Sequence, residues 1–352
     1  MSKKVMGLVV MLSFFCLLIS TMAFAKDKVI HWKVQGCVPN GMLFHETLER
    51  LAKTVNDATD GRLVWEVFPS GTFVPGFEGL KAVSDGIYQV NYGYPGQWVG
   101  KIQTAAIMNS VPGGFNSYGM QMWHEYGGGK ELYQEMYDQA KYNVKVFREA
   151  SCSMENFQWA KKPLETIADF KGVKMRMMPL MGDVLSKHGF SVAFVPASEI
   201  IPDLQRGVLD AAEYSISAFD ITLGIDEVCN YVMLPGIHQP TGSLEVLINK
   251  DAWNALPEDL KKSVEIAINK SRFDNMMFME ARNIAAVQEI EKKGIHRVNM
   301  DPDAVKQMIE WSDEYLDEVA KKDSFFAKVR ASQKAFAAKW YPYIKEHTLN
   351  HQ

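Results

Sequence analysis

The stretch KGVKMRMMPLMGDVLSKHGFSVAFVP, residues 171–196, holds the pattern that decides the fold. Residues 173–178 form a short apolar run typical of a buried strand, and residues 180–188 have the spacing of a helix that Gly189 ends. A second apolar run follows at 191–195. Strand, helix and strand in this order predict a parallel α/β unit.

Arg176 is the unusual residue in this unit because it stands among apolar residues near the exit of its strand. A charge buried there would cost several kcal/mol or more unless it is paired. The guanidinium fork matches a carboxylate with two parallel hydrogen bonds. In open α/β sheets, ligands bind at the carboxyl ends of the strands. Arg176 therefore predicts a site for a small organic acid, with a structural ion pair as the alternative.

The N-terminal third predicts a similar unit, with strands at 29–34 and 63–68 and a helix at 43–54 between them. Farther on, a pattern of helix, glycine and strand occurs twice. One copy leads to Tyr94-Pro95 and the other to Glu213-Tyr214. Two strand ends that carry aromatic and polar groups indicate a cleft between two similar domains.

The C-terminal third is helical, and its first helix is unusually long. Pro257 opens a helical pattern that runs to about residue 293, where Gly294 ends it. An unbroken helix of this length would measure roughly 50 Å, longer than one lobe, and could brace both lobes. The predicted division is a signal peptide (1–25), lobe I (26–150 plus about 237–270), lobe II (about 151–236 plus about 295–325), a spanning helix (about 257–293) and a C-terminal helix (326–352).

The first 25 residues have the features of an export signal. Lys3 and Lys4 precede an apolar core, and Ala23-Phe24-Ala25 is a small-x-small cleavage site, so we expect cleavage near Ala25 and a periplasmic protein. Without this segment 36 basic residues face 42 acidic ones, a net charge of −6. This balance indicates no nucleic-acid partner. Three cysteines remain (Cys37, Cys152 and Cys229), so at most one disulfide can form.

Several segments resemble the solute-binding subunit of tripartite ATP-independent periplasmic (TRAP) transporters of the DctP type. They are GTFVP at 71–75, Tyr94-Pro95 with WVGK at 98–101, DFKGVKMR at 169–176, GVLD at 207–210 with Glu213, and PGIHQP at 235–240. The resemblance implies an α/β, two-lobed periplasmic binding protein fold with a long helix spanning both lobes. The segments around Glu213 and at 235–240 are most similar to the branch that binds 2-oxo acids and related 2-hydroxy acids.

The same resemblance implies a site. Its arginine, here Arg176, grips the ligand carboxylate, and a metal ion bridges the ligand and the protein. Glu213 and the main-chain carbonyl of Tyr214 would be metal ligands. Where the branch tends to carry glutamine and glutamate, this chain has Glu155 and Gln239, so the pair is exchanged and the number of acidic groups around the cation is kept. Glu155 and Gln239 would be metal ligands as well. Oxygen ligands of this kind suit Na⁺ or Ca²⁺.

Three aromatic residues are candidates for the wall of the cleft, namely Tyr94, Trp98 and Phe73. Aromatic walls exclude water and strengthen an ion pair between arginine and carboxylate, although each ring could equally be part of the core. With Glu155, Tyr214 and Gln239 they complete the predicted ligand-binding set around Arg176. His238 fits a hydrogen-bonded structural histidine better than a metal ligand.

Three functions compete for this site. The first is capture of a small monocarboxylate and its delivery to the membrane permease of a TRAP transporter. The second is an exported hydrolase, which needs a nucleophile beside a base; the chain has neither Gly-x-Ser-x-Gly nor His-Glu-x-x-His, and we expect no enzyme. The third is a ligand-binding partner of a sensor. Part of the resembling branch exchanges C-terminal helices between two subunits, which implies a possible homodimer.

Overall fold

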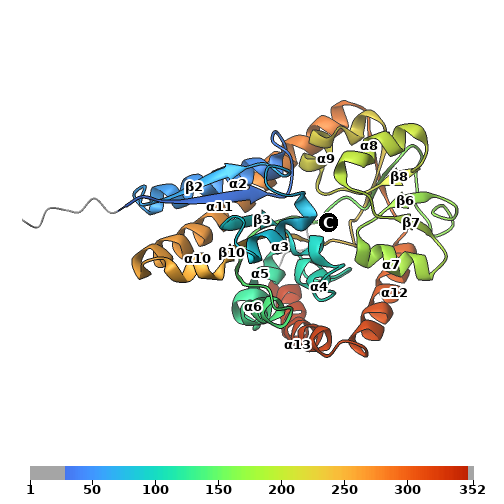
Figure 1. Ribbon diagram of the computed structural model, residues 1–352. Helices are drawn as coiled ribbons and strands as arrows, with labels where there is room; N and C mark the ends of the chain where they lie inside the picture. The colour runs from blue at the N-terminus through green and yellow to red at the C-terminus, as the bar shows by residue number, and fades with distance from the viewer. Residues whose placement is uncertain (1–27, 348–352) are drawn as a thin grey trace, which may run out of the picture.

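A computed structural model describes residues 28–347 as two mixed sheets packed into two lobes. The five-stranded sheet of lobe I has the order β2-β1-β3-β10-β4, and the six-stranded sheet of lobe II has the order β11-β9-β5-β8-β6-β7. Figure 1 shows the first sheet on the left and the second on the right, with the chain crossing between them more than once. The predicted α/β two-lobed fold is confirmed. The predicted signal peptide lies outside the described residues.

The first part of the chain builds most of lobe I. Its elements are β1 (Ile30–Gly36), α2 (Leu43–Ala58), β2 (Leu63–Phe68), η1 (Gly76–Glu78), α3 (Gly79–Ser84), β3 (Val90–Gly93), η2 (Pro95–Trp98), α4 (Ala105–Asn109), α5 (Ser117–Tyr126), α6 (Gly129–Gln139) and β4 (Val144–Cys152). The strands β1 and β2 pair in parallel with α2 between them, as predicted.

The middle of the chain builds lobe II. Its elements are β5 (Gln158–Ala160), β6 (Lys174–Arg176), α7 (Pro179–Lys187), β7 (Ser191–Ala193), α8 (Ala197–Arg206), β8 (Ala211–Ala212), α9 (Ser217–Leu223), η3 (Ile225–Glu227) and β9 (Tyr231–Leu234). The predicted unit at 171–196 is confirmed, since β6 and β7 pair in parallel and α7 connects them.

The rest of the chain returns to lobe I and crosses again. It comprises β10 (Gly242–Asn249), α10 (Lys250–Ala255), α11 (Glu258–Lys292), β11 (His296–Asn299), α12 (Pro302–Ala320) and α13 (Ser324–His347). The strand β10 enters the first sheet antiparallel to both β3 and β4, whereas β11 extends the second sheet parallel to β9. We propose that the lobes follow these two sheets, and the predicted lobe boundaries stay a prediction.

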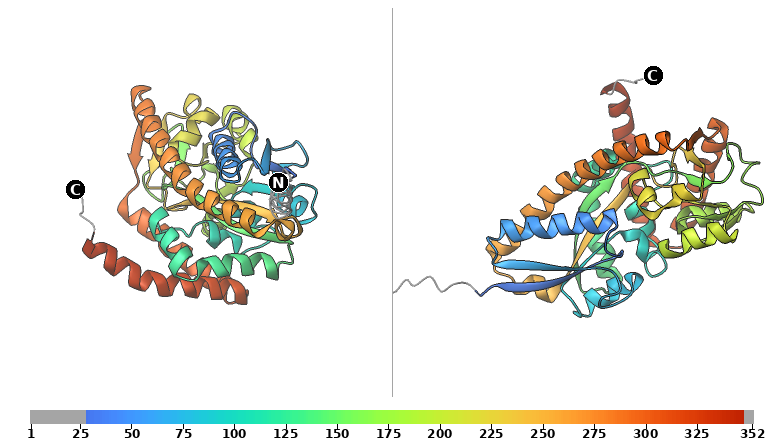
Figure 2. Two further views of the ribbon diagram at one scale, coloured as in Figure 1. Left: turned by 90° about the vertical axis from the view of Figure 1, so that its left-hand side faces the viewer. Right: turned by 90° about the horizontal axis from the view of Figure 1, so that it is seen from above.

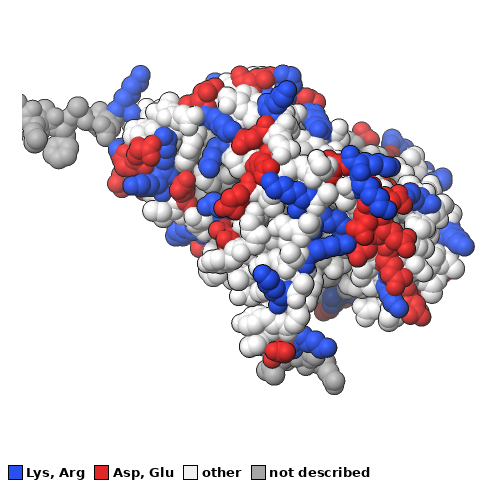
Figure 3. All heavy atoms as spheres, turned by 90° about the horizontal axis from the view of Figure 1, so that it is seen from below, with Lys and Arg blue, Asp and Glu red and all other residues white. Residues whose placement is uncertain are grey.

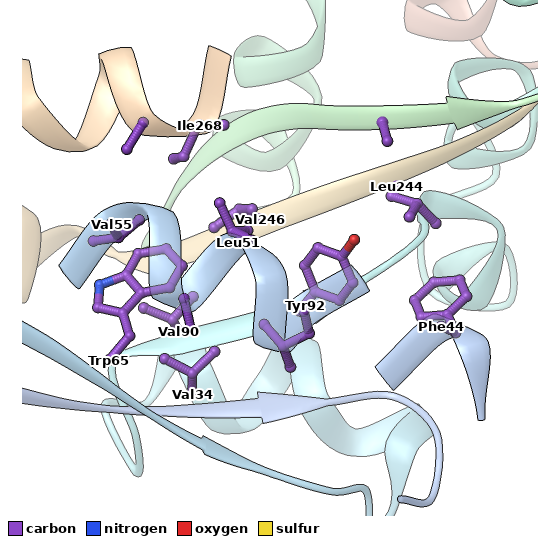
Figure 4. Close-up of a cluster of buried hydrophobic side chains, with 14 of the residues drawn as sticks. Val34, Phe44, Leu51, Val55, Trp65, Val90, Tyr92, Leu244, Val246 and Ile268 are labelled. Carbon is purple, nitrogen blue, oxygen red and sulfur yellow. The ribbon is translucent and has the colours of Figure 1, made fainter. Parts of the chain in front are cut away.

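One of the two core clusters of lobe I lies between its sheet and the helices α2 and α11. Figure 4 shows Leu51 of α2 and Ile268 of α11 directed toward Val246 and Val90 of the sheet. At about 25 cal/mol per Å² of buried apolar surface, such a cluster supplies the main term that stabilises the lobe. Phe44 lies toward one end of this cluster, where the lobes meet.

The helix α11 joins the two lobes, as predicted. Its 35 residues span about 52 Å, and Figure 2 shows it running diagonally along the whole molecule beside α2. It contacts α2 and β4 in lobe I and α9 in lobe II. In lobe I, Ser271 and Asn275 each donate to the buried carboxylate of Glu149 at 2.9 Å. In lobe II, Asn283 accepts the backbone N–H of Ala218 at 3.1 Å.

The surface carries both signs of charge. Figure 3 shows lysine and arginine interspersed with aspartate and glutamate over the face it presents, in keeping with a chain of 38 basic and 42 acidic residues. Between residues 28 and 347, none of the helices is both long enough and apolar enough to cross a membrane. Cys37, Cys152 and Cys229 are free thiols.

Candidate functional site

A cavity of about 460 Å³ lies between the lobes, at the carboxyl ends of strands from both sheets. From lobe I it is lined by Cys37, which follows β1, and by Tyr94, which follows β3. From lobe II it is lined by Arg176 at the end of β6 and by Tyr214, which follows β8. The cleft predicted from the two repeated strand ends is therefore present, and both of its aromatic–polar ends face one space.

Arg176 is 3% exposed, and one edge of its guanidinium is paired within the protein. Its Nη1 donates to Glu213 Oε1 at 2.5 Å and to the Glu213 carbonyl at 2.7 Å. The other edge has weaker partners, because Nε lies 3.4 Å from the Val195 carbonyl and Nη2 lies 3.9 Å from Met178 Sδ. The guanidinium also stacks on the ring of Phe194 at 5.0 Å. Arg176 thus forms a structural ion pair through Nη1, while Nε and Nη2 keep only weaker partners.

Three buried ionisable groups meet beside this arginine. Glu155, Glu213 and His238 each place a ligand atom within 4.8 Å of the others. His238 Nε2 lies 3.4 Å from Glu155 Oε2 and 3.8 Å from Glu213 Oε2, and Glu213 Oε2 has no hydrogen-bond partner among the described residues. Burial opposes charging of His238, but the two carboxylates outweigh it and raise its pKa to about 9.

The two carboxylates differ in their surroundings. Burial raises the pKa of Glu155. Burial acts in the same direction on Glu213, but the Arg176 guanidinium and His238 outweigh it and hold the pKa of Glu213 below its usual value. With His238 protonated, two positive and two negative groups balance one another here. An incoming carboxylate would leave one negative charge in excess.

Gln239 contacts Glu155 directly. Its Nε2 donates to Glu155 Oε2 at 2.6 Å, and its Oε1 accepts from Asn109 Nδ2. The two residues that the resemblance marked as exchanged are therefore neighbours, and one carboxylate and one amide meet here. Asn109, which was not predicted, fixes the amide orientation and so presents the N–H of Gln239 to Glu155.

Buried groups behind the cavity hold the two segments that carry Glu155 and Tyr214. Asp220 accepts from Asn156 Nδ2 at 2.7 Å, from Trp159 Nε1 at 2.7 Å and from the Ser215 backbone N–H at 2.9 Å. It therefore ties residues 155–156 to residues 214–215. The sequence offered one signal for this role, a lone acid on an otherwise apolar helix.

Gly236 allows the close approach of a third segment. A Cβ built on it would lie 1.8 Å from the Glu155 carbonyl oxygen, so only glycine fits there. The backbone N–H of Glu155 donates to the Gln239 carbonyl at 3.1 Å in the same place. The PGIHQP segment thus positions His238 and Gln239 by packing its backbone against residue 155.

Two aromatic pairs cross from one lobe to the other around the cavity. Phe77 of lobe I meets Phe194 of lobe II with ring centroids 6.1 Å apart, and Phe44 meets Phe219 at 5.9 Å. All four rings line the cavity. None of them was predicted, because nothing in the local sequence distinguishes these phenylalanines from core residues.

Two predicted wall residues, Trp98 and Phe73, lie outside the cavity, which corrects that part of the prediction. Trp98 is fully buried in lobe I, where its Nε1 donates to Glu245 Oε1 at 2.6 Å. Phe73 packs against Phe68 and Tyr88, with ring centroids 4.9 and 5.5 Å away. Both rings pack in the interior of lobe I, whereas their neighbours Pro75 and Gln97 line the cavity.

The donor groups at the junction fit a hard cation. Glu155 and Glu213 supply carboxylate oxygens, and the Tyr214 carbonyl accepts no hydrogen bond from any described residue. The unpartnered Glu213 Oε2 is a buried acceptor that a cation would satisfy. Oxygen donors of this kind suit Na⁺ or Ca²⁺, as the sequence predicted. The nearness of the His238 nitrogens was not expected.

Two lobes, a helix that spans them and a cavity at their junction define a ligand-binding protein of the periplasmic type. The chain belongs to the bacterial extracellular solute-binding protein family 7, DctP, whose model matches residues 36–323. The family and fold are those of substrate-binding proteins of transporters and not of enzymes, so the predicted absence of catalysis agrees with both.

Relatives with known ligands share this fold. The chain is 29% identical, over 92% of its own length and 88% of the other's, to a monocarboxylate 2-oxoacid-binding periplasmic protein of Nostoc. It matches a TRAP solute-binding protein of Bordetella bronchiseptica with calcium and picolinate (TM-score 0.86, 25% identity, 91% and 95% of the chains). It also matches one of Pseudoalteromonas atlantica with sodium and pyruvate (TM-score 0.84, 27% identity, 90% and 97%).

The contact at Gly236 predicts a local test. Gly236→Ala should lower the free energy of unfolding by about 3 kcal/mol or more, because the added methyl group must displace backbone. Urea unfolding followed by fluorescence measures this. Gly100→Ala is the matched control, since a Cβ there meets nothing within 4 Å. Equal stabilities of the two variants would contradict the close approach.

The buried Glu245 predicts a pH dependence in lobe I. Burial, only partly offset by hydrogen bonds from Tyr133, Trp98 and Tyr137, raises the pKa of Glu245 to about 7. The folded protein therefore keeps a proton that the unfolded chain loses above about pH 4.5. The Glu245 contribution to stability should fall by about 3 kcal/mol between pH 5 and 8.

Glu245→Gln removes this titration. The free energy of unfolding of the variant, relative to that of the natural protein, should rise as the pH increases from 5 to 8. Denaturant titrations at four pH values measure the slope, and Glu131→Gln, an exposed change on α6, is the control. A relative stability that is independent of pH would show that Glu245 stays ionised.

Proposed function

We propose that this protein captures a 2-oxo or 2-hydroxy monocarboxylate between its lobes and delivers it to the membrane permease of a TRAP transporter. The single observation that carries the proposal is the guanidinium of Arg176. One edge is held by Glu213, the other edge is weakly bonded, and the residue lines the cavity. A carboxylate that approaches this edge gains charge-assisted hydrogen bonds away from bulk water. The ligand named for the Nostoc relative supports this chemical class.

A cation completes the proposed site. Glu155 and Glu213, the Tyr214 carbonyl and the Gln239 side-chain amide would hold Na⁺ or Ca²⁺ beside the ligand. The bound ion supplies a positive charge that attracts the carboxylate and 2-oxygen of the ligand. Within the protein, Arg176 and His238 balance Glu155 and Glu213, so a cation offsets the extra charge that the acid brings. The calcium–picolinate and sodium–pyruvate complexes of the two structural relatives support this assignment.

The remaining predicted residues have secondary roles in the proposal. Tyr94 and Tyr214 would flank the ligand from opposite lobes, since both line the cavity. Burial raises the pKa of both phenols, so both stay neutral and can donate or accept a hydrogen bond. Closing the lobes around the acid would then bring these groups together, and the affinity would depend on closure.

We also propose export to the periplasm with cleavage near Ala25, and a homodimer. The aromatic side chains of Tyr118, Tyr341 and Tyr343 are 60%, 45% and 52% exposed on α5 and α13 and form a surface that a second subunit could cover. The calcium–picolinate relative is described as a dimer.

Light scattering of the purified protein measures the assembly, and a monomeric mass at micromolar concentration would contradict the dimer.

Arg176 gives the direct test. Arg176→Lys keeps a positive charge near Glu213 but loses the planar fork, so the dissociation constant for pyruvate should rise by about 100-fold or more. Arg176→Ala should abolish binding and also lower the melting temperature, because it leaves the Glu213 carboxylate buried and unpaired. Isothermal titration calorimetry measures the affinity.

The control for these variants is Arg206→Ala in the same lobe. The Arg206 side chain is 66% exposed, and its ion pair with Asp203 lies within one helix turn. Binding by this variant should match that of the natural protein. Unchanged affinity of Arg176→Lys, with the fold verified by circular dichroism, would remove the arginine from the site.

The contact between Glu155 and Gln239 gives a sharper test of the cation. Glu155→Gln should weaken the cation-dependent affinity for acid by about tenfold or more, because it removes a carboxylate from the site. The double exchange Glu155→Gln with Gln239→Glu should restore most of it, since the two side chains touch. Titrations are made in calcium, in sodium with chelator, and in choline with chelator.

Glu199→Gln, an exposed change in lobe II, is the control for the single variant. It should leave the affinity unchanged in all three buffers. Equal affinity of the natural protein in all three buffers would exclude the cation. Failure of the double exchange to rescue a weakened Glu155→Gln would show that the two positions are not equivalent.

A further inference from the structure

The charged groups of the cavity occupy only part of it. Arg176, Glu155 and Gln239 are joined to one another or to Glu213 by the contacts described above, so they form one compact group. A cavity of about 460 Å³ falls in the range of pockets that hold drug-sized ligands. Pyruvate carries only a methyl group beyond its carboxylate and oxo oxygen. Most of the space is therefore not needed for the acid end of a ligand.

The helices α2 and α9 supply an apolar wall to this space. Met42 and Phe44 at the start of α2 line it from lobe I, and Phe219 and Leu223 of α9 line it from lobe II. The two helices contact each other, with Phe44 against Phe219. This wall offers neither a charge nor a side-chain hydroxyl. A ligand group next to it gains by being apolar, at about 0.8 kcal/mol for each buried methylene.

The charged residues that line the cavity also restrict which groups the rest of the ligand can carry. Among the described residues that line the cavity, Arg176 is the only lysine or arginine. A second carboxylate or a phosphate on the ligand would be buried without a cationic partner, at a cost of several kcal/mol. Hydroxyls of the ligand that lie against Met42, Phe44 and Leu223 would lack side-chain hydrogen-bond partners there.

We propose that the ligand is a monocarboxylate with an unbranched or branched apolar side chain of several carbons, and that Met42, Phe44, Phe219 and Leu223 hold this side chain. The inference rests on the proposed function, because the carboxylate of the ligand must sit on Arg176 for its tail to reach the wall between α2 and α9. The inference narrows the proposed ligands to those 2-oxo and 2-hydroxy acids that carry such a side chain.

A homologous series tests the inference on the mature protein. Calorimetric titrations use pyruvate, 2-oxobutanoate, 2-oxopentanoate, 2-oxohexanoate, 4-methyl-2-oxopentanoate and, as a dicarboxylate, 2-oxoglutarate. The affinity should rise about fourfold with each methylene, or about 60-fold from pyruvate to 2-oxohexanoate. The dicarboxylate should bind more weakly than 2-oxopentanoate, the acid with a chain of equal length.

Two variants test the wall itself. Met42→Ala and Leu223→Ala should each lower the ratio of the 2-oxohexanoate affinity to the pyruvate affinity by roughly tenfold, because the tail loses apolar contacts. Both side chains are only half-buried, so shortening them should leave the fold intact. Met122→Ala is the matched control, because Met122 is also half-buried and packs in lobe I away from the cavity. The ratio of the 2-oxohexanoate affinity to the pyruvate affinity should not change in this variant.

The outcomes separate this inference from the proposed function. If no acid of the series binds, the proposed function fails and the inference fails with it. If pyruvate binds but the affinity is flat or falls with tail length, only the inference is overturned. If 2-oxoglutarate binds best, both the inference and the assignment of a monocarboxylate ligand fail. An unchanged ratio in both Met42→Ala and Leu223→Ala would show that the tail lies elsewhere in the cavity.

Discussion

The ion pair between Arg176 and Glu213 is the constraint on which the site depends. Both side chains are almost fully buried, and two charges in a medium of low polarity are tolerable only when they are paired and hydrogen-bonded. Glu213 holds Nη1 of the guanidinium through a carboxylate oxygen and its own carbonyl, which leaves Nε and Nη2 with weaker partners. Glu213 therefore orients the Arg176 side chain and leaves some of its N–H donors for a ligand.

The surrounding structure keeps this arrangement in place by buried hydrogen bonds and close backbone contacts. Asp220 ties the segment of Glu155 to the segment of Tyr214, and Gly236 lets the PGIHQP segment approach Glu155. Neither residue lines the cavity. Both residues fix the backbone of other residues that line the cavity. This role explains why a binding protein of this size buries so many polar groups at its centre.

The long helix α11 explains how the lobes can share one site. It packs on α2 and β4 of one lobe and on α9 of the other, and its contacts with Glu149 and Ala218 are hydrogen bonds with defined partners. The aromatic pairs between Phe77 and Phe194 and between Phe44 and Phe219 cross the cleft itself. A ligand between the lobes would thus be covered by apolar rings, which strengthens the charge interactions at Arg176.

The local sequence determined the elements of this protein and marked several candidate site residues. Periodicity and glycines predicted the parallel units around α2 and α7 and the length of α11, because these features depend on neighbours along the chain. An arginine among apolar residues marked Arg176, because burial of an unpaired charge is too costly to be accidental. Glu155 was placed by resemblance, and the structure brings it against Gln239.

The tertiary structure alone decided which side chains meet. The insertion of β10 as an antiparallel strand, the pairing of Phe44 with Phe219, and the supporting bonds of Asp220 and Asn109 all join residues far apart in sequence. Trp98 and Phe73 show the converse, since aromatic rings near a motif are equally suited to a core or a cavity wall. Composition sets whether a ring is buried, but the path of the backbone sets which space it faces.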